Sequence, residues 1–384
     1  MTRSISILGA TGSVGSSTLD LVRRNRGEWR VEALTANCNV AELAKLAREF
    51  DARLAAVADE TCLAALREAL AGTGIEAAGG PAALCEAAAR GADVTVAAIV
   101  GCAGLAPTMA AIEQGGIVAL ANKEALVSAG EVMTAAVARH GATLLPVDSE
   151  HNAIFQCLAG NDIAEVRSIT LTASGGPLRT WTREQLEAAT PAQAIAHPNW
   201  DMGAKISVDS ATMMNKGLEL IEAAHLFPVP LASIRIVIHP QSVIHSLVEY
   251  RDGSTLAQLG PSDMRVPIAS CLAWPRRMET PCKPLDLPAL GGLTFFAPDE
   301  ERFPATRLAR QAAEAGGAAP AVLNAANEVA VAAFLAGQIS FTRITALVEQ
   351  TLSRPLPSAP AKLDDVLSAD AEARATAAEM LENA

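Results

Sequence analysis

The chain has 384 residues, half of them apolar and 19% charged, which is the composition of a globular protein with about two or three domains. Its formal net charge of −12 argues against nucleic acid or an anionic membrane as a partner. Seven scattered cysteines without CxxC spacing argue against a zinc ribbon or disulfide framework and suit a reduced, cytoplasmic setting. The longest apolar run, about Val94 to Ile112, is interrupted by two glycines and a proline, so it predicts a strand and a helix instead of a membrane span.

The first 24 residues predict a dinucleotide-binding turn. A strand at Ser4–Leu8 leads into the loop Gly9–Gly15, and a helix follows over Ser16–Arg24. Glycines allow the backbone to approach a pyrophosphate, and the helix N-terminus favours its negative charge. The spacing is GxxGxxG and not GxGxxG, so a tight turn without a ligand is the alternative.

The next strand favours NADPH over NADH. We expect this strand at Trp29–Leu34, and the residues after it, 35–39, include no Asp or Glu. A carboxylate at this strand end usually binds the ribose 2′-hydroxyl of NAD, and its absence removes repulsion against a 2′-phosphate.

Alternating elements extend this α/β pattern to about residue 121. Helices are expected at 40–49, 60–71 and 105–114, and strands at 94–100 and 117–121. Ligands of open parallel sheets bind beyond the carboxyl ends of the strands, so Lys123 would lie where nicotinamide and substrate meet. A solvated surface lysine is the alternative.

Two carboxylates follow the predicted strand 142–145. Asp148 and Glu150 are two residues apart, so on an extended strand both side chains point to the same side. Two facing carboxylates repel unless a positive group lies between them. Oxygen ligands of this kind suit Mg²⁺ or Mn²⁺.

The middle of the chain offers three polar segments. Ser174 precedes two glycines in a turn that could form an anion-binding nest, with a simple turn as the alternative. The loop 196–203 has the composition of a lid that closes over a ligand, with a packed surface loop as the alternative. Residues 207–222 predict one helix, with Asn215, Lys216 and Glu219 on one face. Lys216 and Glu219 form either an ordinary surface ion pair or part of a metal and phosphate site.

The remaining chain predicts support and assembly. A hairpin turn at 251–254 joins two antiparallel strands with one face open for a partner, so a homodimer through this sheet is expected. Prolines and glycines from 275 to 298 indicate a linker. The rest is helical, and Asn324 and Asn327 are expected to make local hydrogen bonds.

Taken together, these segments resemble the 1-deoxy-D-xylulose 5-phosphate reductoisomerase family over essentially the whole chain. The resemblance is carried by the ordered set 9–15, 121–125, 146–152, 173–177, 197–203, 209–219, 239–250 and 323–328. It implies an NADPH-dependent and Mg²⁺- or Mn²⁺-dependent oxidoreductase and isomerase of isoprenoid precursor biosynthesis. The implied reaction rearranges a phosphorylated keto sugar by a retro-aldol/aldol route and reduces the product to 2-C-methyl-D-erythritol 4-phosphate.

The resemblance also implies a role for each matching residue. The metal ligands are Asp148, Glu150 and Glu219, and the catalytic residues are these three with Lys123 and His197. The substrate is contacted by Lys123, Ser149, Glu150, Ser174, His197, Trp200, Ser210, Asn215, Lys216 and Glu219. NADPH is contacted by Thr11, Gly12, Ser13, Val14, Ala36, Asn37, Asn39, Asn122, Glu124 and Gly203. Trp200 and Met202 lie on a mobile flap. Asn37 and Cys38 depart from the Gly and basic residue that family members often carry there.

The implied fold is α/β plus α+β. It has an NADPH-binding Rossmann-like domain at 1–149, a catalytic, metal-binding and dimerisation domain at 150–274, a linker at 275–300 and a C-terminal helical domain at 301–384. Two other readings stay open. A dehydrogenase like the homoserine dehydrogenases would explain Ala121-Asn122-Lys123 but not the three carboxylates. A non-catalytic protein that senses NADPH is the second.

Overall fold

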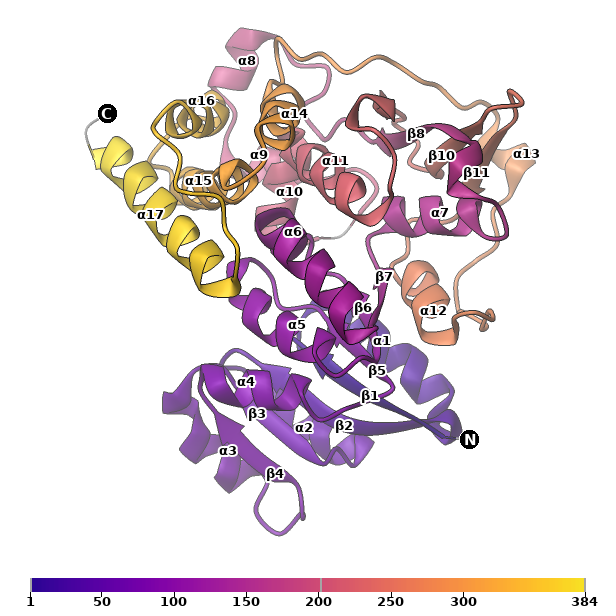
Figure 1. Cartoon of the computed structure of the whole chain (residues 1–384), viewed down its shortest axis with the longest axis vertical. Coiled ribbons are helices and arrows are strands. Elements are labelled where there is room, and N and C mark those ends of the chain that lie inside the picture. Colours follow the sequence, from indigo (N-terminus) through magenta and orange to yellow (C-terminus); the bar gives the residue numbers. More distant parts are fainter. Residues whose placement is uncertain (1, 201, 383–384) are drawn as a thin grey trace. The chain divides into compact units, whose positions relative to one another are not determined.

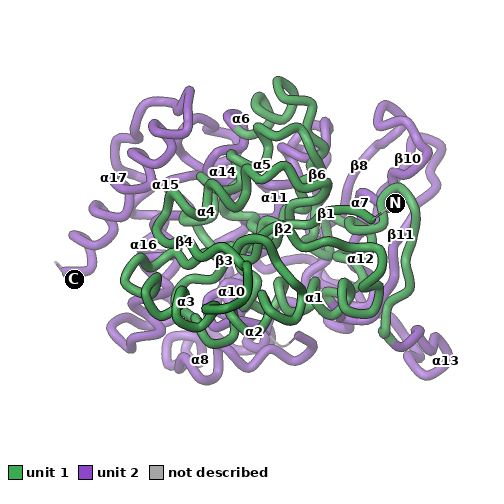
Figure 2. The backbone as a smooth tube through the Cα atoms, turned by 90° about the horizontal axis from the view of Figure 1, so that it is seen from below, with its two compact units in different colours: residues 1–125, 133–152, 264–282 green, residues 126–132, 153–263, 283–384 purple. Residues whose placement is uncertain are grey.

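The computed structural model describes residues 2–200 and 202–382, and the chain divides into two compact units (Figure 2). Unit 1 comprises residues 1–125, 133–152 and 264–282, and unit 2 comprises residues 126–132, 153–263 and 283–384. The chain therefore passes between the units several times. The helices α6 (Lys123–His140) and α7 (Ser149–Leu158) each contribute residues to both.

Unit 1 is built on a seven-stranded parallel sheet with the order β4-β3-β2-β1-β5-β6-β7 (Figure 1). Its strands are β1 (Arg3–Leu8), β2 (Trp29–Ala36), β3 (Leu54–Val57), β4 (Glu76–Gly79), β5 (Val94–Ala97), β6 (Ile117–Leu120) and β7 (Thr143–Pro146). The order reverses between β1 and β5, where Leu8 pairs with Ala97. This switch point is where doubly wound sheets bind their ligands.

Helices and short 3₁₀ turns connect these strands. They are α1 (Ser13–Arg24), η1 (Arg26–Glu28), α2 (Val40–Phe50), η2 (Glu60–Cys62), α3 (Leu63–Ala69), α4 (Pro81–Ala88), η3 (Cys102–Gly104), α5 (Leu105–Ile112) and, much later in the chain, α12 (Arg265–Ala273). The helix α4 packs on β2 and β3, α5 on β6, and α12 on β6 and β7. Because helices cover the sheet, central strands such as β3 and β5 are buried along their whole length and read as apolar runs.

Unit 2 contains a four-stranded mixed sheet with the order β11-β10-β8-β9. Its strands are β8 (Val166–Ala173), β9 (Ile234–Ile238), β10 (Ile244–Tyr250) and β11 (Thr255–Leu259). The β10–β11 hairpin is antiparallel, as the turn at 251–254 predicts, whereas β8 and β9 run parallel. The strand β11 lies at the edge of the sheet, and most of its residues are exposed.

Helices supply the rest of unit 2. They are α8 (Arg183–Glu187), α9 (Pro191–Ala194), α10 (Ala204–Ala211), α11 (Met214–Leu226), α13 (Leu287–Leu290), α14 (Ala305–Ala315), α15 (Ala319–Leu335), α16 (Phe341–Leu352) and α17 (Leu363–Glu382), with the 3₁₀ turns η4 (Ile163–Glu165) and η5 (Leu231–Ser233). The helix α15 packs against α14, α16 and α17 (Figure 1), and one apolar core joins these helices to α11 and β8. Among the described residues, no helix is long and apolar enough to cross a bilayer.

The structure corrects two local expectations. Residues 207–222 are not one helix, because Met213 adopts a left-handed backbone with φ of 67° and separates α10 from α11. Asp209 therefore lies near the end of α10, two residues before its last residue. The segment 148–150 is not extended either, since β7 ends at Pro146 and α7 begins at Ser149.

Candidate active site

The predicted dinucleotide loop lies at the switch point of the unit 1 sheet. Gly9 has φ of 82°, and a Cβ atom there would lie 2.7 Å from the Ala98 oxygen. A Cβ atom on Gly15 would lie 2.4 Å from the Gly9 oxygen, so α1 packs directly on the loop. Gly12 precedes α1 and has no side chain to cap the first N–H groups of the helix. A helix N-terminus without a side-chain cap is a suitable place for an anion, and the binding of a pyrophosphate there stays a prediction.

The other predicted cofactor residues in unit 1 lie around that loop, at carboxyl ends of strands. Thr11, Ser13 and Val14 surround the start of α1, while Ala36, Asn37 and Asn39 follow β2. The Asn39 side chain accepts a hydrogen bond from the Glu42 N–H at 3.3 Å and caps α2. Asn122 is buried, accepts from the Ala125 N–H at 3.1 Å and donates to the Gly101 oxygen at 3.0 Å. Asn122 thus ties the end of β6 to the loop after β5, and Glu124 lies two residues further on, in the first turn of α6.

Lys123 and Asp148 form a buried ion pair in unit 1. The Lys123 Nζ atom lies 2.5 Å from Asp148 Oδ2, and the two side chains are 7% and 10% exposed. Lys123 is therefore not a solvated surface lysine. Both residues follow neighbouring strands, β6 and β7, which explains why they meet. The Lys123 ammonium group supplies the positive charge that reduces the repulsion between Asp148 and a nearby carboxylate such as Glu150.

Glu150 lies beside Asp148 through a helix turn and not through strand alternation. Asp148 precedes α7, and its Oδ1 atom accepts from the Glu150 N–H at 3.1 Å. The Ser149 hydroxyl donates to Glu150 Oε2 at 2.9 Å. Asn152 closes the segment by donating to the Pro146 oxygen at 2.9 Å. The side chains of Asp148, Ser149 and Glu150 are thus gathered in one turn of chain.

A second group of predicted site residues lies on α11 in unit 2. Glu219 is fully buried, accepts a hydrogen bond from Asn215 Nδ2 at 2.6 Å and forms an ion pair with the buried Lys216. The shared helix face therefore forms as predicted. Burial excludes the alternative of an ordinary surface ion pair, because both charges have left water and depend on each other.

Ser174 and His197 meet at 2.8 Å between Oγ and Nε2. Ser174 follows β8, and its Oγ atom also accepts from the Gly176 N–H at 3.1 Å. His197 Nδ1 accepts from the backbone N–H groups of Asn199 and Trp200 at 3.2 and 3.0 Å, so this nitrogen carries no proton. Nε2 then carries the proton and donates a hydrogen bond to Ser174 Oγ. Burial lowers the pKa of His197, which favours this neutral form.

Of the remaining predicted residues, Ser210 is half-buried near the end of α10 and Gly203 precedes that helix. Trp200 and Met202 are half-buried in the loop before it, and Asp201 lies outside the described residues. Unit 1 thus gathers Lys123, Asp148, Ser149 and Glu150. Unit 2 pairs Ser174 with His197 and groups Asn215 and Lys216 around Glu219. The metal set, which combines residues of both units, stays a prediction.

Sequence reasoning missed one buried polar contact in unit 2. Asn327 on α15 donates from Nδ2 to Asp209 Oδ1 at 2.8 Å, and Lys205 forms an ion pair with Asp209 Oδ2 at 2.8 Å. Asn324 does make the local bond that was expected, to Glu328 at 3.1 Å, whereas Asn327 does not. Two asparagines within an apolar helix were the available signal, because buried amides need partners. The contact fixes Asp209, the residue before Ser210.

A parallel sheet with a glycine turn at its switch point and polar side chains after the next strands is the fold class of dinucleotide-dependent oxidoreductases. Three family models match the chain: "1-deoxy-D-xylulose 5-phosphate reductoisomerase" over residues 5–130, its C-terminal domain over 144–227, and "DXP reductoisomerase C-terminal domain" over 259–376. The chain belongs to the 1-deoxy-D-xylulose 5-phosphate reductoisomerase family.

Full-length relatives bear the same name. The chain is 58% identical to the 1-deoxy-D-xylulose 5-phosphate reductoisomerase of Zymomonas mobilis, over 99% of this chain and 98% of that protein. It is 60% identical to that of Rhodospirillum centenum, over 99% and 94%. The solved structure of the Zymomonas mobilis enzyme in complex with NADPH matches with a TM-score of 0.95 and 56% identity over all of both chains. A reductoisomerase structure in complex with NADPH, fosmidomycin and magnesium matches with a TM-score of 0.94 and 44% identity, over 99% and 98%. These matches confirm the predicted fold class.

Proposed function

We propose that this chain is an enzyme that converts 1-deoxy-D-xylulose 5-phosphate into 2-C-methyl-D-erythritol 4-phosphate, with NADPH as the reductant and a divalent metal ion. The observation that carries this proposal is the match over essentially the full length to reductoisomerases, at 58% and 60% identity. Two matching structures hold NADPH, and one of them also holds magnesium. The family assignment does not favour a homoserine dehydrogenase-like activity or a non-catalytic sensor.

NADPH would bind at the switch point of the unit 1 sheet and supply the hydride. The fit rests on the tight glycine loop, in which a Cβ atom on Gly9 or Gly15 would collide with the backbone of the chain itself, and on the N-terminus of α1, which carries no side-chain cap. We assign the pyrophosphate to the backbone of Thr11, Gly12, Ser13 and Val14, and the adenosine side to Ala36, Asn37 and Asn39. The end of β2 carries no carboxylate, which suits a 2′-phosphate. Asn122, Glu124 and Gly203 complete the proposed contacts.

We assign the metal to Asp148, Glu150 and Glu219. All three offer oxygen ligands, which suit Mg²⁺ or Mn²⁺. The support is that Asp148 and Glu150 lie in one turn of chain and that Glu219 is buried and oriented by Asn215 and Lys216. When bound, the ion supplies polarisation of the substrate carbonyl and a neighbouring hydroxyl. Lys123, held on Asp148, would donate a hydrogen bond to a substrate oxygen in the same place, and Ser149 would bind the substrate beside it.

The substrate phosphate would bind in unit 2, against Ser174, Ser210, Asn215 and Lys216. His197 keeps its proton on Nε2 and donates a hydrogen bond from it to Ser174 Oγ, which leaves the Ser174 hydroxyl hydrogen available for a phosphate oxygen. Lys216 supplies positive charge, which an acidic chain needs locally to bind a phosphorylated sugar. Trp200 and Met202 would close over the substrate and exclude water from the charged intermediates.

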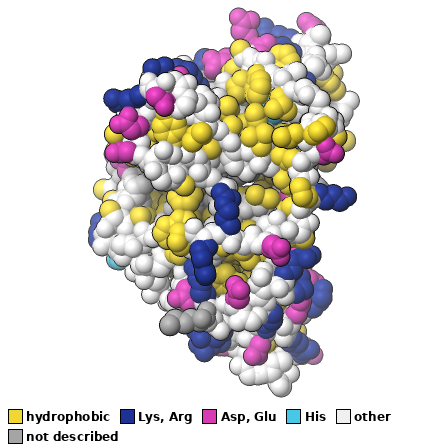
Figure 3. Space-filling view, turned by 90° about the vertical axis from the view of Figure 1, so that its right-hand side faces the viewer, with side chains coloured by type: hydrophobic (Ala, Val, Ile, Leu, Met, Phe, Trp, Pro, Cys, Tyr) yellow, Lys and Arg dark blue, Asp and Glu magenta, His cyan; other side chains and the backbone are white. Residues whose placement is uncertain are grey.

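We further propose that the enzyme is a cytoplasmic homodimer that pairs through β11. This edge strand exposes Leu256 and Leu259, and Leu287 and Phe295 are exposed in the same unit. Figure 3 shows hydrophobic side chains gathered on the side where Figure 1 places β11 and α13. An exposed apolar sheet edge is a ready site for pairing with another strand. We also propose that the domains span residues 1–149, 150–274 and 301–384, with a linker at 275–300.

The decisive experiment follows NADPH oxidation by 1-deoxy-D-xylulose 5-phosphate with Mg²⁺ and after removal of metal by EDTA. We expect turnover with metal and its loss with EDTA, restored by adding Mg²⁺ or Mn²⁺. Oxidation that persists unchanged in EDTA would refute the metal mechanism. No oxidation with metal present would refute the proposed activity.

The Glu219→Gln variant tests the metal assignment separately. We expect turnover to fall by at least about a hundredfold, because a metal ligand and its charge are lost, while NADPH affinity measured by fluorescence stays nearly unchanged. Glu249→Gln is the matched control, since Glu249 lies on β10 and pairs with the exposed Arg167 and Arg235. Loss of NADPH binding in Glu219→Gln, or normal turnover, would contradict the role of Glu219.

A further inference from the structure

A cavity of about 430 Å³ in unit 2 is separate from every residue assigned above. It lies between the turn after β8, the junction of α10 and α11, and the segment 296–306. Its walls are formed by Gly175, Arg179, Thr180, Met213, Ile238, Phe296, Ala297, Pro298, Asp299, Arg302, Phe303 and Thr306. This volume lies within the range of small-molecule sites, about 300 to 1,000 Å³.

The cavity carries one uncompensated positive charge. Arg302 pairs with Asp299 at 2.8 Å and donates to the Trp181 oxygen at 2.6 Å, so its charge and donors are occupied. The Arg179 guanidinium lies over the Phe296 ring, 5.5 Å from its centroid. Within the described part of the chain, no carboxylate lies at ion-pair distance from Arg179. A guanidinium that stacks on a ring keeps its N–H donors at the edge, where they can bind an acid group.

The rest of the lining is largely apolar. Met213, Ile238 and Phe303 are buried and form the inner wall, and Phe296 is half exposed at the rim. The hydroxyl groups of Thr180 and Thr306 are the remaining polar side-chain groups beside the charged ones. Apolar walls with a few convergent polar groups are typical of pockets that bind small organic molecules.

We propose that this cavity binds an organic anion with a flat apolar body, such as an arylcarboxylate or arylsulfonate. The acid group pairs with Arg179, and the ring system packs against Phe296, Ile238 and Phe303. An inorganic anion would leave this apolar surface in contact with water, and a neutral hydrocarbon would leave Arg179 without a counter-charge.

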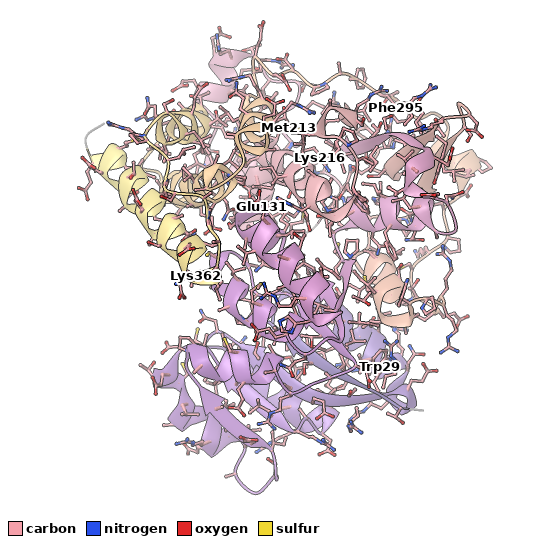
Figure 4. The ribbon with its side chains drawn as sticks, viewed as in Figure 1. Trp29, Glu131, Met213, Lys216, Phe295 and Lys362 are labelled. Atoms are coloured by element: carbon pink, nitrogen blue, oxygen red, sulfur yellow. The ribbon has the colours of Figure 1, made fainter. Side chains whose placement is uncertain are left out.

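The occupant would touch two backbone turns that carry proposed phosphate-binding residues, so its effect on turnover rests on the proposed function. The Arg179 side chain packs on Gly175, where a Cβ atom would lie 2.3 Å from Arg179 Cδ, and Ser174 is the next residue. Met213, strained at φ of 67°, lies between Ser210 and Asn215 in the chain. Figure 4 labels Met213 and Lys216 in this part of unit 2. A ligand that prefers one arrangement of these turns shifts their population and thereby changes turnover.

The binding test uses 8-anilinonaphthalene-1-sulfonate, an arylsulfonate that fluoresces when bound. We expect one saturable site on the full chain that persists at saturating NADPH. Arg179→Met should weaken binding at least about tenfold, because a charge-assisted pair is lost. Phe296→Ala removes the stacked ring at an exposed position and should also weaken it. Arg235→Met, an exposed arginine of β9 outside the cavity, should stay within about twofold.

Equal binding by wild type and both cavity variants overturns the site, since the probe then lies elsewhere, for example on the exposed apolar residues of β11. Complete displacement by NADPH overturns it as well, because the probe then occupies the dinucleotide site. Thermal unfolding checks that each variant is folded. If Arg179→Met does not fold, binding of the probe by Phe296→Ala alone tests the site.

The kinetic test uses naphthalene-2-sulfonate, which does not absorb where NADPH oxidation is followed. We expect it to displace the fluorescent probe and to lower kcat with little change in KM for the sugar phosphate. In Arg179→Met, naphthalene-2-sulfonate should no longer lower kcat, when kcat is compared with that of the same variant without the compound. Binding without any effect on rate refutes the coupling, whereas binding in a chain that shows no turnover at all refutes the proposed function and leaves the site standing.

Discussion

Replacing Asn327 by Asp tests the buried contact between α15 and α10. The two side chains have the same shape, so the change exchanges only the amide donor for a carboxylate oxygen, 2.8 Å from Asp209 Oδ1. Asn327 is fully buried and Asp209 is 1% exposed, so water cannot separate the charges. One of the two carboxyls must then keep a proton in the folded state.

The magnitude follows from that proton. Holding a proton on a carboxyl with an ordinary pKa near 4 costs about 1.4 kcal/mol for each pH unit above it, or about 4 kcal/mol at pH 7. Lys205 on the other oxygen of Asp209 offsets part of the repulsion, so we expect Asn327→Asp to lose about 3 to 4 kcal/mol. The folded variant binds one more proton than the unfolded chain, so its stability rises as the pH falls from 8 toward 5.

Asn327→Ala is the matched control. It removes the donor without adding charge, and should cost about 1.5 to 3 kcal/mol at every pH in this range, the value of a hydrogen bond to a charged group. Urea denaturation followed by circular dichroism at pH 8, 7 and 6 measures both variants against wild type. A penalty for Asn327→Asp below about 1 kcal/mol, or one that does not change with pH, would refute the reasoning.

Two further predictions concern packing and thiol chemistry. Gly130→Ala should destabilise the protein by about 1 to 3 kcal/mol in urea denaturation, because the added Cβ would lie 2.2 Å from His225 Nε2. Gly27→Ala is the control and should be neutral, because no atom lies within 4 Å of a Cβ there. Equal stability of the two variants would contradict this packing. Burial raises the pKa of the Cys157 thiol to about 11 and also raises the pKa of the Cys271 thiol. Iodoacetamide at pH 8 should therefore alkylate the exposed Cys38 first, which mass spectrometry of peptides can measure. Early modification of Cys271 would disprove its burial.

The sequence predicted the parts of this fold that local rules determine. The glycine loop fixed β1 and α1, and four-residue spacing placed Asn215 and Glu219 on one helix face. The sequence also placed Lys123 at the carboxyl end of a strand, and the structure has it directly after β6; its place beside nicotinamide and substrate stays a prediction.

The features that could not be predicted from the sequence depend on tertiary structure. The helix is interrupted at Met213, whose left-handed backbone is uncommon for a non-glycine residue and is imposed by its surroundings. The helical pattern of the sequence therefore gave no sign of this break. Asp148 and Glu150 were grouped correctly within their turn for the wrong reason, because the chain enters α7 directly after β7. The bond between Asn327 and Asp209 spans 118 residues, and spacing rules do not reach that far.

The helix α12 has a consequence for how this protein can be made in the cell. It packs on α1, β6 and β7, and Arg265 reaches Asp20 at 3.0 Å, yet it is synthesised more than a hundred residues after the strand it covers. During synthesis, part of one apolar face of the sheet therefore stays uncovered until α12 has left the ribosome. During that interval the exposed apolar surface makes the growing chain prone to aggregation.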